Sequence, residues 1–392
     1  MLGADSLKLT LEGARELALK GHPAIAAQEF QAQASRESGR QLRAGLGPQF
    51  TAGVTGSVAD EFSRFVFAGV SSPALFSRFG GGVQMTQMIH DFGRAKEGIQ
   101  AAKLRADGQR EGVKASRLQV ILALDRAYYG VLSAKAREEL AARNLQLLRN
   151  LPERAEDSNA ASLRVMEAEF QLVKAANDRK GVEAELVEAI GLKGESELDL
   201  ADGSAAGQLP ETLELVIQQA MQERPELRQL SLELEASAHQ MEAERKASRP
   251  TISAMAVGGL IPATTFPTFN HYGSASVSIS IPIWNGRLFE SRQNEAALRM
   301  RAVEKVKADQ ENQISRQLRL SYLSAKTAFE RMKFTRAVVQ EARTRTEHAS
   351  AGAEALEARL NESAAGIEHL IAGYEYLLSI SALRWQSGEV PH

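Results

Sequence analysis

The chain of 392 residues contains no cysteine, and this absence excludes several kinds of chemistry. Without a thiol there is no disulfide, no thiolate-ligated metal, no cysteine nucleophile and no lipid anchor attached through cysteine. An oxidising compartment is compatible with this composition, but the composition does not indicate one.

Long apolar runs, charge of one sign and aromatic residues are also scarce. The apolar run Val120–Leu124 is typical of the longest in the helical segments and falls far short of the roughly 18 residues of a membrane-spanning helix. The net charge of −2 gives no basic surface of the kind that binds nucleic acid. Aromatics make up 6% while alanine is abundant, which favours long, closely packed helices over one thick core.

The first residues, Met1–Ser6, lack the basic and apolar regions of a signal peptide. The chain is therefore expected to be either cytosolic or the mature form of an exported protein.

Catalytic and metal-binding patterns are missing as well. The pair Glu138-Glu139 is typical of a solvated helix face, and Gly80–Gly82 lacks the helix and lysine of a phosphate loop, so we interpret it as a flexible start of a strand. No nucleophile, base and orienting group occur together, and we expect no enzyme, cofactor or metal site. The scattered histidines show no i, i+4 spacing that suits a metal: His22, His90, His239, His271, His348 and His392.

The chain contains one long unit twice. Six positions of the first half recur at a constant offset of 202 residues, and four later positions recur at an offset of 194, so one loop is shorter in the second copy. A duplication of this length indicates two similar halves packed with pseudo-symmetry. Thr10, Leu11, Glu12, Ala18, Pro23 and Pro48 match Thr212, Leu213, Glu214, Ala220, Pro225 and Pro250, and Ile89, Asp91, Tyr128 and Ala134 match Ile283, Asn285, Tyr322 and Ala328.

Each copy is predicted to run helix, strand, loop, strand, helix, helix. The first helical element covers about 10–46, with Thr10 as its N-cap and Glu12 favourable near its N-terminus; Pro23 and Pro225 are expected to break or kink it in the two copies. Period-2 patterns predict four strands of about ten residues. They lie at about 48–58, 81–91, 250–260 and 273–283, and the first two and last two flank loops that contain several phenylalanines.

The clearest strand pattern places apolar residues on one face and serines on the other. Val277, Ile279, Ile281 and Ile283 alternate with serines at 276, 278 and 280. Near 83–91 the alternation is weaker, because Gln87 falls among apolar residues.

After each strand pair, long helices are expected to about 151 and 350, with returning helices from about 161 to 192 and 363 to 386. Apolar residues at threes and fours predict coiled-coil packing of these helices. The predicted domains are a first repeat at 7–192, a connector at 193–210 and a second repeat at 211–388.

Strands of this length and polarity fit a membrane-spanning barrel, because a tilted strand of 9–11 residues crosses the hydrocarbon and a barrel pairs every backbone group. Outer-membrane barrels show such alternation together with aromatic girdles. Four strands cannot enclose a water-filled lumen, so several chains would have to pool strands. A small soluble sheet capping a helical bundle remains the alternative.

The order and spacing of several motifs resemble the TolC family of outer-membrane efflux proteins over about 9–388. The resemblance rests on Leu9–Glu12 with Ala18 and His22-Pro23, the turns Asp91–Arg94 and Pro282–Arg287, and the positions Ala127-Tyr128 and Ser321-Tyr322. It implies a mainly α fold with β: a duplicated unit of long antiparallel coiled-coil helices with four transmembrane strands per chain. Three chains would form a 12-stranded barrel in the outer membrane of a Gram-negative bacterium, above a helical barrel in the periplasm.

The resemblance also implies a function and partners. The trimer would be a passive exit duct of a tripartite efflux or type I secretion system, docked to a periplasmic adaptor and an inner-membrane pump, in contact with outer-membrane lipid and not with nucleic acid. A soluble periplasmic coiled-coil adaptor or scaffold is the main alternative, and an enzyme with a helical tunnel is a second one. The cargo is not readable from the sequence.

In the family the helix-hairpin tips form the gate and meet the adaptor. Here the tips are expected near 153–162 and 360–370, although the family's Gly-Leu, Ser or Thr, acidic pattern is only partly kept. A charge repeated by threefold symmetry would form a ring at a constriction. The expected gate residues are Glu362, Glu368, His369, Glu156 and Asp157, and the expected adaptor contacts are Ser162, Leu163, Ala365, Gly366 and Ile367.

Overall fold

The computed structural model describes residues 7–58, 65–67, 70–72, 78–150, 158–192, 198–201, 207–264, 270–350 and 353–389. The chain forms two compact units. The first unit consists of Met1–Ala32, Gln109–Leu230 and Val306–His392, and the second of Gln33–Gly108 and Ser231–Lys305. Each unit takes segments from both predicted repeats, so the repeat boundaries at 7–192 and 211–388 remain a prediction about the sequence.

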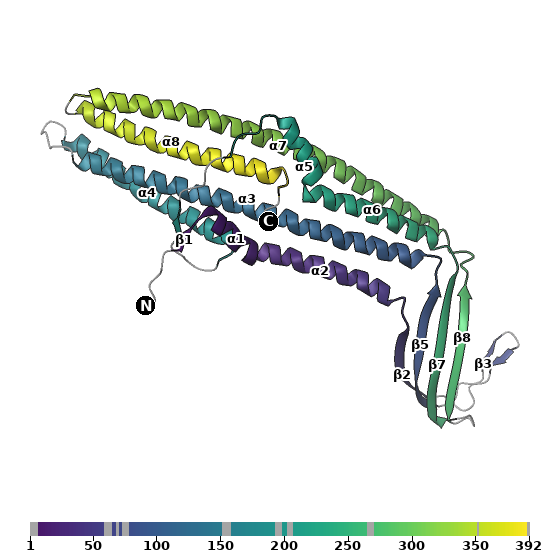
Figure 1. Ribbon diagram of the computed structural model, residues 1–392. Helices are drawn as coiled ribbons and strands as arrows, with labels where there is room; N and C mark the ends of the chain where they lie inside the picture. The colour runs from purple at the N-terminus through teal and green to yellow at the C-terminus, as the bar shows by residue number, and fades with distance from the viewer. Residues whose placement is uncertain are drawn as a thin grey trace. The chain divides into compact units, whose positions relative to one another are not determined.

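The helices follow the predicted pattern, with a break at each proline (Figure 1). His22 N donates to Ala18 O at the end of the first helix, and Arg224 N donates to Ala220 O at the corresponding end in the second repeat. Proline then opens the next helix, where a missing amide costs nothing. The helices are α1 (Leu11–Gly21), α2 (Pro23–Ala44), α3 (Arg94–Arg149), α4 (Ser158–Ile190), α5 (Leu213–Glu223), α6 (Pro225–Lys246), α7 (Leu288–His348) and α8 (Ala353–Gln386).

The N-caps of α1 and α5 differ although their sequences repeat. Thr10 is the predicted cap, and its side chain accepts a hydrogen bond of 3.1 Å from Gly13 N. Thr212 stands at the matching position of α5 and makes no such bond. The duplicated sequence therefore gives the same helix start with different local stabilisation.

The core of the first unit is packed around Tyr128 of α3. Leu124, Leu186 and Ile190 are buried beside its ring. Its hydroxyl donates to Ala201 O at 2.6 Å and lies 3.1 Å from Leu9 O. These carbonyls belong to the ends of a short parallel pair, β1 (Leu7–Leu9) and β6 (Leu198–Leu200), which the sequence did not predict because three residues are too few to show a period.

The second unit contains a four-stranded antiparallel sheet in the order β2-β5-β7-β8. Figure 1 shows the four strands side by side. Their bounds are β2 (Gln49–Ser57), β5 (Arg78–His90), β7 (Thr251–Thr264) and β8 (His271–Ser280), and a small hairpin, β3 (Phe65–Phe67) and β4 (Val70–Ser72), lies between the first two in sequence.

Two details of the predicted strands are wrong. The last strand was expected to reach 283 but ends at Ser280, which pairs with Thr251, the first residue of β7; beyond it Pro282 has no amide to donate. Gly80–Gly82 lies inside β5 rather than in a flexible start, and a register shift occurs there between Phe79 and Gly81. Most of the loop phenylalanines expected to form girdles lie outside the described residues.

Candidate functional site: a two-faced sheet, its helix junctions and the hairpin ends

The register of the sheet sorts its side chains into an apolar face and a polar face. Phe50 pairs with Met85, Ala52 with Val83, Ala254 with Val277, and Ile252 with Ile279. On the other face Gln49 pairs with Thr86, Thr51 with Gln84, and Ser253 with Ser278. Gln87 on the apolar face and Met88, Met255 and Val257 on the polar face are exceptions.

The apolar face is uncovered in the single chain. Phe50, Val54, Val277 and Ile279 are all exposed, although their burial would be worth about 1.5–3 kcal/mol for each side chain. On the polar face the Ser253 and Ser278 hydroxyls lie 3.0 Å apart. One side of this sheet is therefore suited to hydrocarbon and the other to water.

Glycines on the polar face make room for Tyr272 of β8. A methyl group at Gly82 would lie 2.4 Å from the Tyr272 hydroxyl, and one at Gly259 would lie 2.6 Å from it. Gly53, which pairs with Gly82 in the neighbouring strand, has nothing within 4 Å of such a methyl group. The tyrosine therefore lies across β7 and β5 where only glycine leaves space.

The turns from strand to helix are built differently in the two repeats. Phe92 and Gly93 have positive φ angles of 53° and 84°, and Asp91 accepts hydrogen bonds from Gly93 N at 3.0 Å and Ala95 N at 2.6 Å. The Asp91 carboxylate thus caps the start of α3. In the second turn Gly286 and Arg287 have positive φ, and the amide nitrogen of the Asn285 side chain is buried and has no hydrogen-bond partner among the described residues.

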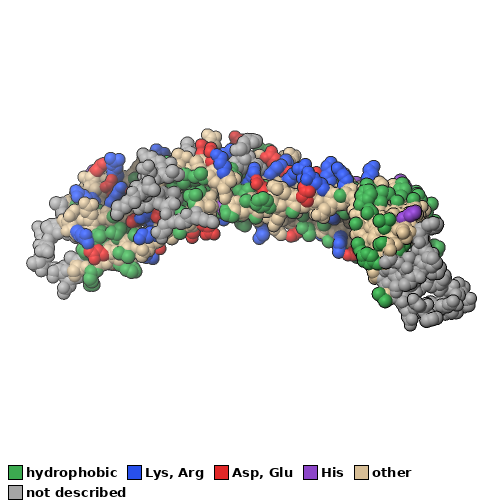
Figure 2. Space-filling view, turned by 90° about the horizontal axis from the view of Figure 1, so that it is seen from below, with side chains coloured by type: hydrophobic (Ala, Val, Ile, Leu, Met, Phe, Trp, Pro, Cys, Tyr) green, Lys and Arg blue, Asp and Glu red, His purple; other side chains and the backbone are tan. Residues whose placement is uncertain are grey.

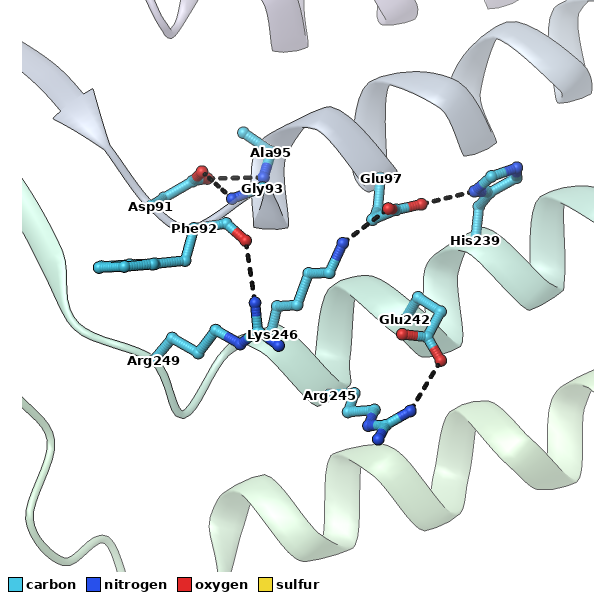
Figure 3. A network of polar contacts seen from close by, with 10 residues as sticks. All are labelled: Asp91, Phe92, Gly93, Ala95, Glu97, His239, Glu242, Arg245, Lys246 and Arg249. Carbon is cyan, nitrogen blue, oxygen red and sulfur yellow. Dashed lines mark hydrogen bonds and ion pairs between the residues drawn. The ribbon is translucent and has the colours of Figure 1, made fainter.

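Next to the first turn, Glu97 of α3 links two residues of α6 (Figure 3). Its carboxylate accepts a hydrogen bond from Lys246 Nζ at 2.7 Å and lies 2.6 Å from His239 Nδ1. The bonds from Lys246 and then from His239 lower the pKa of Glu97. Arg249 also donates to Phe92 O at 3.3 Å, so the end of α6 is fastened to the beginning of α3.

The first unit contains a fully buried carboxylate, Asp125 of α3. Arg15 of α1 donates two hydrogen bonds to it, at 2.8 and 2.7 Å, and Trp385 Nε1 of α8 donates a third at 2.8 Å. The Ser381 hydroxyl donates another. Burial raises the pKa of the neighbouring Tyr129, and the Asp125 charge raises it further. These groups connect three helices that are far apart in sequence.

The second hairpin end does not lie where it was predicted. α7 ends at His348 and α8 begins at Ala353, so the expected tip at 360–370 falls inside α8. Glu362 is half-buried there, Glu368 pairs with Arg331 at 3.1 Å, and His369 Nδ1 lies 3.0 Å from the Thr335 hydroxyl. The segment 353–364 is rich in Ala, Leu and Glu, and its helix propensity outweighs the partial motif that suggested a turn.

The structure also contradicts two of the expected adaptor contacts. Ala365 and Ile367 are buried, and Ile367 packs with Ala136 of α3 in the chain's own core. Gly366 lies between them within α8. At the first hairpin end, Ser162 and Leu163 are exposed on α4, whereas Glu156 and Asp157 lie outside the described residues.

A groove of about 1140 Å³ runs along α7 and α8 toward the true hairpin end. Small side chains such as Ala342 and Ala358 leave the space between the helices, and Phe334 and Val338 make part of its wall apolar. Glu368 and Ala365, two of the predicted site residues, line it as well.

Among the described residues, no group of acidic and histidine side chains could hold a metal ion. The described helices also contain no segment with the length and hydropathy needed to cross a membrane.

Comparison with known proteins decides the family. The model of the outer membrane efflux protein family matches residues 14–192 and 216–376. The chain belongs to this family. A search of curated proteins finds no match.

Solved structures show the same fold. The chain is similar to the outer membrane protein VceC of Vibrio cholerae, with a TM-score of 0.75, 16% identity and coverage of 96% of both chains. It is similar to the MtrE outer membrane channel of Neisseria gonorrhoeae, with a TM-score of 0.74, 17% identity and coverage of 96% of this chain and 88% of that one. For CusC the TM-score is 0.78 at 14% identity, with coverage of 98% and 93%.

Membership of this family explains why the sheet has one apolar and one polar face. Outer membrane efflux proteins are transport ducts, so this chain is an outer-membrane exit channel rather than the soluble adaptor or scaffold that was the alternative. The predicted fold, helices with four strands in a duplicated unit, is confirmed. The sequence reasoning missed Asp125, although an acidic residue directly after the apolar run Val120–Leu124 was a usable signal of a buried charge.

Proposed function

We propose that three copies of the chain assemble into one duct, with a 12-stranded barrel in the outer membrane and a helical barrel in the periplasm. The duct is passive, and a periplasmic adaptor and an inner-membrane pump supply cargo and energy. The single observation that carries the proposal is the register of the sheet, which gives one apolar face and one polar face over four strands.

The edges of the sheet support association through strands. Among the described strands, β2 and β8 each pair on one side only. In hydrocarbon an unpaired edge would leave backbone groups unsatisfied at a cost of several kcal/mol for each group. Two copies would give eight strands, whose interior is filled by side chains. Three copies give 12 strands, in agreement with the resemblance to the TolC family, and leave room for water along the polar face.

The helices also present apolar surfaces that the single chain does not cover. On α4, Leu163, Met166, Phe170 and Val173 are spaced by three and four residues and are between 56% and 64% exposed. On α7, Leu320 and Leu323 are similarly exposed. Such spacing is typical of a coiled-coil seam that lacks its partner, and neighbouring copies in the trimer supply that partner.

The end of the α7–α8 hairpin is the proposed contact for the adaptor. Its groove is partly apolar, with Phe334 and Val338, and partly charged, with Glu341 and Arg345. A helix laid into an apolar groove with a polar rim is a common mode of protein recognition. We place the gate at the same end of the hairpin.

Assembly and conduction test the duct directly. The purified protein should require detergent, have the mass of three chains by native mass spectrometry, and form conducting pores in planar bilayers. Phe170→Glu should weaken the trimer because it places a charge in the helix seam, whereas Gln171→Glu adds the same charge at an exposed polar position and should not. A monomer that stays dissolved without detergent and forms no pores would refute the proposal.

The adaptor site has its own test. Ala342→Trp fills the groove between α7 and α8 and should reduce cross-linking to the adaptor while leaving pore formation unchanged. Gln340→Trp, at an exposed position of the same helix outside the groove lining, is the control. Equal cross-linking by both variants would place the adaptor elsewhere.

A further inference from the structure

Charge is distributed unevenly in the second unit. The four strands of the sheet contain no aspartate, glutamate or lysine, and their one arginine, Arg78, begins β5 at the end away from the helices. Lysines and arginines appear as soon as the strands give way to helices. Figure 2 shows hydrophobic side chains gathered at the strands and basic side chains on the helices beside them.

Five cations near the strand ends have no carboxylate partner among the described residues. We call this set the cationic collar. Its members come from three helices that adjoin the sheet and from the turn between α6 and β7, and they are partly or fully exposed. They are Arg43 in the last turn of α2, Arg94 and Lys96 in the first turn of α3, Arg249 directly before β7, and Arg292 near the start of α7.

The stability of the helices does not explain the collar. Arg94, Lys96 and Arg292 lie near helix N-termini, where the helix dipole favours anions and disfavours cations by about 0.3–1 kcal/mol. Some cations further along the same helices are paired, as in Arg105–Glu233 at 3.2 Å and Arg299–Glu295 at 2.6 Å. Arg94 and Lys96, in the first turn of α3, therefore lie against the local electrostatic preference.

Exposed aromatic side chains also lie where the strands of the sheet join the helices. Phe50 is the second residue of β2 and is 69% exposed, Trp284 precedes α7 and is 86% exposed, and Phe92 lies between β5 and α3. Exposed aromatics beside an apolar band mark the boundary between hydrocarbon and water. The collar therefore lies just outside the apolar face of the sheet, at the depth of lipid headgroups.

We propose that the cationic collar binds the phosphates of anionic phospholipids in the periplasmic leaflet of the outer membrane. This inference rests on the proposed function, because it requires the sheet to span that membrane. Basic residues directly beside a membrane-spanning segment attract anionic headgroups, each contributing through the surface potential. A lipid surface fits better than one soluble anion, since the collar residues are distributed over three helices and the turn before β7 instead of converging on one pocket.

Fluorescence quenching by brominated lipids measures whether the collar prefers anionic over zwitterionic lipids. The chain has two tryptophans; Trp284 is in the collar region, and Trp385 is only 5% exposed in the core of the first unit. The protein is reconstituted in phosphatidylcholine vesicles with brominated phosphatidylcholine or brominated phosphatidylglycerol. At low salt phosphatidylglycerol should be preferred at least about twofold, and high salt should remove the preference. Trp284→Phe should abolish most of the quenching.

Two fourfold variants identify the residues responsible. R43Q/K96Q/R249Q/R292Q removes most of the collar and should bring the preference close to one. R316Q/R319Q/K326Q/R336Q removes the same charge from exposed, unpaired positions of α7 and should keep the preference. Native mass spectrometry checks that both variants remain assembled, and a collar variant that does not assemble is replaced by the single variants K96Q and R292Q.

The possible failures are distinguishable. Equal quenching by the two lipids in a protein that inserts and conducts overturns the lipid inference and leaves the duct intact, whereas failure to insert or conduct overturns the proposed function. If the collar variant keeps its lipid preference but changes the ion selectivity of the pore, the collar lines the water path and the inference is wrong. The inference is also wrong if the collar variant keeps its lipid preference and loses binding to the adaptor.

Discussion

The buried Asp125 should control how firmly α1 is held in the first unit. Asp125→Asn removes the charge that receives two hydrogen bonds from Arg15, one from Trp385 and one from Ser381. The amide oxygen of asparagine cannot accept all four, and its NH₂ group faces donors. Hydrogen bonds to charged groups contribute about 1.5–3 kcal/mol each, and removing one partner of a buried ion pair costs about 3–5 kcal/mol. A loss of about 3 kcal/mol is expected.

Hydrogen exchange of α1 measures this loss without requiring reversible unfolding of an assembled membrane protein. Arg15 is the residue of α1 in this cluster, so weakening its ion pair should allow α1 to open locally. A loss of about 3 kcal/mol corresponds to exchange that is faster by about a hundredfold. Mass spectrometry of the peptide covering Leu11–Gly21 measures this exchange rate directly, and all variants are compared at the same protein concentration.

Two controls define the result. Asp178→Asn makes the same change at an exposed position of α4 and should leave the exchange of α1 unaltered. Arg15→Met combined with Asp125→Leu removes both charges and should recover part of the loss, because no unpaired charge stays buried. If Asp125→Asn speeds the exchange of α1 by less than about threefold, the reasoning on this cluster is refuted.

Three further predictions concern single positions. Thr10→Ala should destabilise the protein by about 1 kcal/mol through loss of its N-cap bond, and Thr212→Ala should have little effect, as denaturant unfolding would show; equal losses would contradict the role of the cap. Gly82→Ala should cost about 1–3 kcal/mol by thermal unfolding, because its methyl group meets a tyrosine hydroxyl and a carbonyl, whereas Gly53→Ala on the paired strand should be tolerated. Because the pKa of Glu97 is lowered from 4.5, its contribution to stability is present above pH 4.5 and is lost as the pH falls through the lowered value. Glu97→Gln should therefore show a weaker loss of stability in acid by circular dichroism, and identical acid titrations would count against the network.

Features with a local physical cause were predictable from the sequence. The proline breaks at Pro23 and Pro225 follow from a missing amide, and the two faces of β8 up to Ser280 follow from a period of two residues. The N-cap at Thr10 was also read correctly from its residue type.

The candidate site was predicted less well. The hairpin end lies between His348 and Ala353, before the expected tip at 360–370, because the helix-forming residues at the start of α8 outweigh the partial family motif around Gly366. The end strand was extended beyond Ser280, since alternation along a sequence does not reveal where the pairing strand begins. Neighbouring residues in the sequence could not have corrected either error, because each depends on which segment of the chain packs or pairs opposite.

The sequence by itself determined that the chain is duplicated and that its clearest strand has one apolar and one polar face, since repetition and period are properties of the order of residues. Only the tertiary structure decided what joins the segments. It placed Trp385 beside Asp125, 260 residues away in sequence, and it gave the two copies different caps and turns. The physical reason is that hydrogen bonds and ion pairs depend on distance in space, whereas period and propensity depend only on neighbours along the chain.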